Sequence, residues 1–367
     1  FKQPGLSFKT LYHNGLVERK GDSTLGPVTA TEPKFFTHLI KSKAQLKTLL
    51  DKDSSIPGRK NYPDMLRMAL EAGKFGTFKM LSRDDEHMPG FKSGDEVTIQ
   101  VLGPVVEKTG QDKTGLRDFG NTGFTKNGHS VVLRLTYGKV RMLLGGDLNI
   151  PAEKLLLSSI MGKPVPEKKT ELNKYIKEAR KKLEVDIAKS CHHGSADFSS
   201  LFLSAVNPIV TVISSGDDEP HSHPRAETLG AIGVTSRGER PLIFSTELAR
   251  SAKDAIRDPA QERRQLKAAH TAVLKATEAI NKAKNPQEKA KASKAKTEAN
   301  KAFRKLVDDT INRTVQVYGA IYVRTDGHDV VIAQRIERSS AGKQWDVSEL
   351  RPDAKGVLHF KSKYQGE

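Results

Sequence analysis

The chain has 367 residues, of which 36% are hydrophobic and 29% are charged, so we expect two domains, or one large domain with an insertion. Its formal charge is +17, a surplus that favours polyanionic partners, with nucleic acid ahead of an acidic membrane surface. The only cysteine is Cys191, which excludes an intrachain disulfide and is typical of a reducing cytoplasm. No apolar run approaches the roughly 20 residues of a membrane helix, so we expect no membrane span.

The first hundred residues show mixed patterns. Apolar residues have helical spacing over 35–50 and 63–73, and residues 97–102 alternate as a strand does. The polar stretch 105–128 contains several glycines and is interpreted as a long loop.

The clearest local structure is a β-hairpin formed by residues 130–135 and 140–144 around the turn at Tyr137-Gly138-Lys139. Strand and helix patterns then alternate, which predicts an α/β layered domain. The segments in question are a helix over 151–161, a lysine-rich helix over 168–183, a strand over 185–188, a helix over 199–206 and a buried strand over 209–213.

A helical hairpin is predicted further along the chain, because Leu266, Val273 and Ile280 are seven residues apart. Alanines occupy the other seam position, Asn285-Pro286 interrupts the pattern, and Ala292, Ala295, Ala299, Ala302 and Leu306 resume it. Residues 251–310 carry 15 basic and 8 acidic side chains. We expect a basic antiparallel coiled coil with a small-residue seam.

Strand patterns return after this hairpin, over 315–323 and 330–336 around the turn at Asp326-Gly327. The expected organisation is therefore an α/β domain over 1–246, an inserted helical hairpin over 247–316, and a return to the β-sheet with a C-terminal tail over 317–367.

Possible metal ligands gather at the ends of the predicted strands. Hydrolytic metal sites need neutral imidazoles and a carboxylate converging on one point, with a position left open for water. Asp147 follows two glycines at a strand end, where its two oxygens are able to bridge two metal ions. Five of the 11 histidines lie at or beside strand ends within the same span: His129, His192, His193, His221 and His223.

Each of these features also has an ordinary structural reading, because Gly-Asp is common in turns and adjacent histidines occur in exposed loops. Their combination in this order on an α/β scaffold favours a metal site.

The runs 130–149, 185–218 and 221–233 resemble the second half of a metallo-β-lactamase-fold hydrolase, and among these the soluble domain of ComEC-type DNA-uptake proteins. The resemblance implies an αββα sandwich interrupted by the helical hairpin. It also implies site roles: Asp147 bridges the metals, His193 and His129 are metal ligands, His192 and His223 assist catalysis, and Ser195 and His221 contact the substrate.

One departure from this family is large, since its leading His-x-His-x-Asp-His motif is absent from the chain. The first residue is Phe rather than Met, so we expect the sandwich to lack its N-terminal part and that motif to lie upstream. The other explanation is a degenerate protein that has lost half of its ligands.

The favoured hypothesis is a metal-dependent phosphodiesterase or nuclease with two divalent ions, zinc or manganese, acting on nucleic acid in the cytoplasm. Two alternatives remain open. One is an interaction or scaffold module that binds a protein partner through the hairpin at 247–316 and has an inactive metal fold. The other is a hydrolase of a small phosphodiester or ester.

Overall fold

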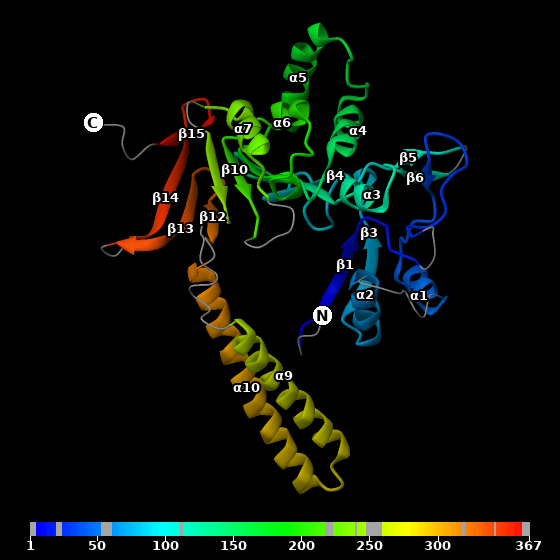
Figure 1. The fold of residues 1–367 in the computed structure, drawn as a ribbon, viewed down its shortest axis with the longest axis vertical. Coiled ribbons are helices and arrows are strands. Elements are labelled where there is room, and N and C mark those ends of the chain that lie inside the picture. The colour runs from blue at the N-terminus through cyan, green and yellow to red at the C-terminus, as the bar shows by residue number, and fades with distance from the viewer. Residues whose placement is uncertain are drawn as a thin grey trace.

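The protein is described from a computed structural model, which combines a central mixed sheet with helices, three further sheets and a projecting helix pair (Figure 1). No helix in the described part of the chain is long and apolar enough to cross a membrane. The described residues are 5–19, 24–52, 61–110, 113–216, 223–238, 241–246, 259–317, 320–340 and 343–361.

The central sheet has six strands in the order β11-β10-β9-β8-β7-β4. Strands β4, β7 and β8 are antiparallel neighbours, as the predicted hairpin requires, and β8 to β11 are parallel. The strand bounds are Val97–Gly103 for β4, Val132–Tyr137 for β7, Val140–Leu144 for β8, Ile187–Lys189 for β9, Val210–Ile213 for β10 and Leu242–Ser245 for β11.

Helices cover one face of this sheet, because each parallel strand needs a crossover that carries the chain back to the edge where the strands begin. Leu143 and Ala188 point from the sheet into a core with Leu157 and Phe202 from the helices. Helix α4 starts after Asn149, whose side chain accepts the Ala152 N–H as an N-cap. The helices are α4, Ile150–Met161, α5, Lys169–Leu183, α6, Ser200–Val206, and α7, Ala226–Thr235.

A separate antiparallel sheet in the order β12-β13-β14-β15 covers the opposite face. Val330 and Ile332 are fully buried there against Ile187 and Val210, whereas Val331, between them in sequence, is exposed. The strands are β12, Ile321–Thr325, β13, Val330–Ser340, β14, Lys343–Pro352, and β15, Leu358–Lys361.

Two expectations for this C-terminal region need correction. Residues 317–367 do not add strands to the central sheet, since the described part forms its own four-stranded sheet. The strand expected over 315–323 starts only at Ile321, because helix α10 continues to Val317. The predicted turn at Asp326-Gly327 is confirmed, and Gly327 accepts a hydrogen bond of 2.7 Å from the Lys139 N–H of the central hairpin.

The N-terminal part forms smaller sheets with their own cores. Residues 35–36 are a strand and not the start of the expected helix. The interpretation of 105–128 as one loop is wrong, because short strands and a helix lie there. The elements are β1, Phe8–His13, β2, Phe35–Phe36, α1, Lys43–Lys52, α2, Asn61–Glu71, β3, Phe75–Met80, η1, Arg83–Asp85, β5, Glu107–Lys108, β6, Thr114–Arg117, and α3, Thr122–Gly128.

The predicted helical hairpin is present as α9, Pro259–Lys282, packed against α10, Pro286–Val317, and it projects away from the sheets (Figure 1). The first helix uses the expected seam, and Val273 is buried in it. The second helix differs, because Ala295 and Ala302 are exposed while Phe303 is buried. A large aromatic ring therefore replaces the expected small-residue contact.

Candidate metal and hydrolytic site

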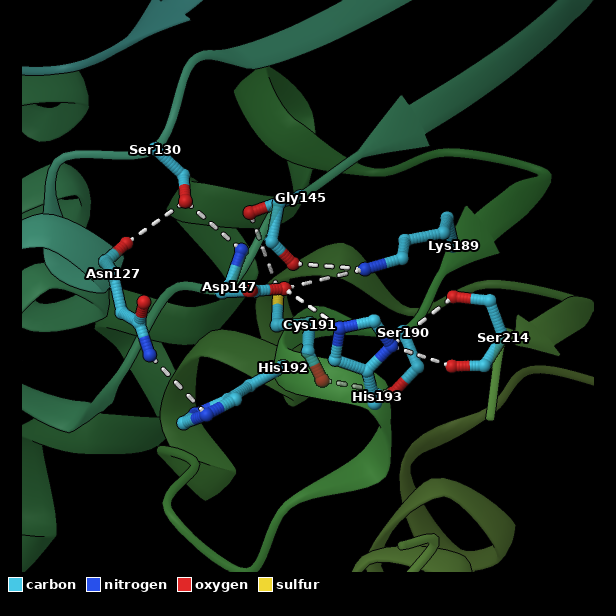
Figure 2. A network of polar contacts seen from close by, with 11 residues as sticks. Asn127, Ser130, Gly145, Asp147, Lys189, Ser190, Cys191, His192, His193 and Ser214 are labelled. Atoms are coloured by element: carbon cyan, nitrogen blue, oxygen red, sulfur yellow. Dashed lines mark hydrogen bonds and ion pairs between the residues drawn. The ribbon is translucent and has the colours of Figure 1, made fainter. Parts of the chain in front are cut away.

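The candidate site lies where three neighbouring parallel strands end (Figure 2). Asp147 follows β8, the histidine pair follows β9 in the short 3-10 turn η2, Cys191–Gly194, and Ser214 follows β10. The carboxyl ends of parallel strands meet at one edge of a sheet, where backbone is free to turn and present side chains. A cavity of about 530 Å³ opens there, lined by Asp147, His192, His193, Ser214, Ser215, Gly216 and His223.

Asp147 and His193 face each other across this cavity (Figure 2). The Nε2 atom of His193 lies 3.5 Å from Oδ1 of Asp147. Its Nδ1 atom lies 2.6 Å from the carbonyl oxygen of Ser214, which only accepts, so Nδ1 carries a proton. In the neutral imidazole, Nε2 is then an acceptor that points at a carboxylate oxygen. Two facing acceptors favour a cation between them, and a metal ion is one such cation.

The separation of these two atoms fits a metal ion. Ligand atoms roughly 2.1 Å from a tetrahedral zinc ion lie about 3.4 Å from each other. The bond from His193 Nδ1 to a backbone carbonyl is also the usual support for an imidazole that binds metal through its other nitrogen. Asp147 and His193 therefore fit one ion.

The described residues supply only part of a complete ligand set. Among them, no group of three or more histidine, cysteine, aspartate or glutamate side chains is arranged to hold a metal ion. The expectation of two ions stays a prediction.

Lys189 is a site residue that the sequence patterns missed. Its ammonium nitrogen lies 3.7 Å from Oδ1 of Asp147 and donates a hydrogen bond of 3.0 Å to the carbonyl of Gly146 (Figure 2). The lysine ends strand β9, directly beside the end of β8, and that position is the only sequence signal for its role. Its positive charge suits a site that binds an anion.

His192 occupies the other side of the cavity. Its Nε2 atom lies 3.3 Å from the amide nitrogen of Asn127, which donates, so Nε2 accepts and Nδ1 carries the proton (Figure 2). That Nδ1 atom is buried and has no hydrogen-bond partner among the described residues. The ring meets His223 edge to face, with 5.7 Å between centroids. The Nδ1–H of His192 is therefore a hydrogen-bond donor with no acceptor among the described residues.

Both histidines of the pair have a left-handed backbone, with φ of 46° for His192 and 54° for His193. Residues with a Cβ rarely adopt this conformation, and such strain concentrates at functional sites. Gly194 follows with φ of 81°, and a Cβ there would lie 2.7 Å from Cβ of Pro224. The turn is thus shaped to present two imidazoles while the His223-Pro224 segment packs closely against it.

Two of the predicted site residues, His129 and Ser195, do not line this cavity. His129 is buried, its Nε2 bonds the carbonyl of Arg117 at 2.8 Å, and its ring stacks on Phe119. Burial lowers the pKa of His129 to about 4, so its ring is neutral and has a structural role. The hydroxyl of Ser195 accepts from the Asp197 N–H at 3.2 Å and does not line the cavity. His221 lies outside the described residues.

The chain matches no protein-family model, and no curated protein has a significantly similar sequence.

Proposed function

We propose that this protein is a metal-dependent hydrolase of the metallo-β-lactamase-like type that cleaves phosphodiester bonds in nucleic acid. Three layers of the expected αββα sandwich have counterparts in the helices α4 to α6, the central sheet and the four-stranded sheet. The single observation that carries the proposal is the facing pair of Asp147 Oδ1 and His193 Nε2, 3.5 Å apart in an open cavity at the strand ends.

Asp147 and His193 are the proposed metal ligands. Asp147 and His193 would hold a divalent zinc or manganese ion, which would supply charge neutralisation to phosphoryl oxygens and polarise the attacking water. Lys189 adds a second positive charge within 4 Å of the same carboxylate. These groups together favour a phosphate over a neutral ester.

His192 and His223 are the proposed catalytic side chains. His192 lines the cavity and is the proposed hydrogen-bond donor to a phosphoryl oxygen or to the departing oxygen. His223 meets His192 edge to face and lines the cavity beside it. Asn127 acts as a positioning residue, because its amide fixes which nitrogen of His192 carries the proton.

The helical hairpin is the proposed contact for the nucleic-acid backbone. Residues 282–305 carry nine lysine or arginine side chains and two glutamates. The helices bury their own apolar seam against each other, so the outer faces present mainly charge. Such a surface suits phosphates better than it suits an apolar protein partner.

Cleavage of a labelled oligonucleotide tests this function, with wild-type protein measured beside Asp147→Asn and His193→Ala in zinc or manganese. We expect both variants to lose at least 100-fold in rate, because each removes one of the two metal ligands. His359→Ala, an exposed change on β15, serves as the control and should keep the wild-type rate. Undiminished cleavage by both ligand variants contradicts the proposal.

A further inference from the structure

A second cavity lies next to the hydrolytic site. It has a volume of about 420 Å³, within the range of small-molecule sites. Asn127 lines it and also contacts His192, the wall of the first cavity, at 3.3 Å. The two cavities therefore adjoin at the Asn127–His192 contact. The second is lined by Tyr12, His13, Asn14, Leu16, Glu18, Tyr62, Lys126, Asn127 and Val131.

A turn after strand β1 lines part of this second cavity. Asn14 accepts the Leu16 N–H through its side-chain oxygen at 3.0 Å, and His13 accepts the Gly15 N–H through Nδ1 at 3.1 Å. The His13 ring lies against Phe78 with 3.9 Å between centroids. Burial lowers the pKa of His13 to about 4, so this ring is uncharged at neutral pH.

The charges in the second cavity balance. Glu18 is buried and accepts a hydrogen bond of 2.7 Å from Lys126, which uses one of the three N–H donors of the lysine. Burial, with a smaller effect from Glu18, raises the pKa of Tyr62 to about 12, so Tyr62 stays a neutral phenol. The first cavity, by contrast, has Lys189 and three imidazoles near one carboxylate.

This contrast indicates what each cavity binds. An ammonium group together with imidazoles suits a phosphate, whereas aromatic rings with an amide, a carboxylate and an ammonium suit a nucleobase. Tyrosines provide faces on which a base stacks. Carboxylate and amide groups pair with the exocyclic amines and ring nitrogens along base edges.

We propose that the second cavity holds the base of a nucleotide adjacent to the phosphate that is cleaved, an inference that rests on the proposed function. A base inserted among side chains cannot remain paired in a duplex. The substrate class is therefore single-stranded nucleic acid, or a strand end that has separated from its partner.

Equilibrium binding tests this inference without relying on cleavage. An Asp147→Asn protein is titrated with a fluorescent single-stranded oligonucleotide and with the matching blunt duplex. Tyr12→Ala in the same background removes one ring of the cavity, Tyr12→Phe keeps it, and Tyr322→Ala removes an exposed ring from the far sheet. Thermal melts confirm that each variant is folded.

We expect the single strand to bind better than the duplex, and Tyr12→Ala to weaken its binding about tenfold, as loss of one stacked base does. Tyr12→Phe and Tyr322→Ala should bind as the parent does. In a series of oligonucleotides with one abasic site each, one position should show the same loss, and Tyr12→Ala should abolish that dependence. Equal binding of duplex and single strand, or an abasic series with no sensitive position, overturns the inference.

The outcome is distinguishable from failure of the proposed function. If the protein binds as expected but never cleaves, the base cavity is supported and the proposed nuclease function is contradicted. If the protein cleaves with no dependence on Tyr12 or on any base, the nuclease function is supported and the base cavity is contradicted.

Discussion

The conformation of single residues decides whether the candidate ligands can meet. Gly146 has φ of 61° directly before Asp147, and a Cβ on it would lie 2.4 Å from Cβ of Ser130. The Ser130 hydroxyl in turn accepts the Asp147 N–H at 3.0 Å. The glycine thus allows the close approach that orients Asp147 toward His193.

Replacement of Gly146 by alanine should therefore disturb both stability and the site. Gly162 is a matched control, since it has φ of 68° and open space around it. Gly162→Ala should cost about 1–2 kcal/mol from backbone strain alone. Gly146→Ala should cost more and should also weaken metal binding. Denaturant unfolding and metal titration measure the two effects, and equal behaviour of the two variants contradicts this role for Gly146.

A second residue-scale prediction concerns Glu153, a fully buried carboxyl group in helix α4. Burial raises its pKa to about 8, although the Ser199 N–H donates to it. Between pH 4.5 and about 8 the folded protein holds a proton here that the unfolded chain releases. The stability contribution is therefore complete at low pH and falls as pH rises through that window.

Glu153→Gln keeps the acceptor for the Ser199 N–H and removes the titration. The stability difference between this variant and wild type should grow by a few kcal/mol from pH 5 to pH 8, in favour of the variant. Glu171→Gln, an exposed change of the same kind, should show no such trend. Unfolding free energies at several pH values measure the stability difference between Glu153→Gln and wild type. Parallel pH profiles for the two proteins count against a buried neutral carboxyl group.

The sequence predicted that Asp147, His192, His193 and His223 lie near one edge of the sheet, and all four side chains line one cavity. It could not exclude His129, since burial against Phe119 depends on packing between distant segments. It missed Asn127 because helix α3 lies in a stretch with no strong periodicity. Contacts between side chains far apart in the chain leave no local pattern.

At the scale of elements, long periodic segments were predicted best. The two hairpin helices, the β7–β8 hairpin and the helices α4 and α5 lie where their patterns predict them, although the second hairpin helix buries Phe303 in place of Ala302. The failures are short elements such as β5 and β6, with two and four residues, which are held by tertiary contacts. Helix α3 has only seven residues, and its Asn121 N-cap is the one local signal that precedes it.

The hairpin seam gives a prediction at this scale. Phe303 is buried and lies 5.5 Å from the His270 ring, whereas the neighbouring Ala302 is exposed. Phe303→Ala should destabilise the hairpin by about 3 kcal/mol, and Ala302→Ser by less than about 0.5 kcal/mol. Amide hydrogen exchange in α9 and α10 measures both. Greater loss of protection in Ala302→Ser would place the seam one residue earlier.

At the scale of the whole molecule, the sheets position the site and the hairpin adds an extended basic surface. Neutralising Lys291, Lys294 and Lys301 to glutamine should lower the slope of log affinity against log salt by about two. The same change at Lys9, Lys154 and Lys355, exposed on the main body, should alter the slope much less. Binding measured at several salt concentrations decides this, and equal slopes for both triple variants remove the hairpin from the interface.

The central claim is that Asp147 and His193 bind a divalent ion, and the metal content of purified protein tests it most directly. Elemental analysis compares wild-type protein with Asp147→Asn, His193→Ala and His359→Ala, the last being an exposed histidine far along the chain on β15. We expect bound zinc or manganese in wild type and in His359→Ala, with strong loss in the other two. Equal metal content in all four proteins would contradict the assignment.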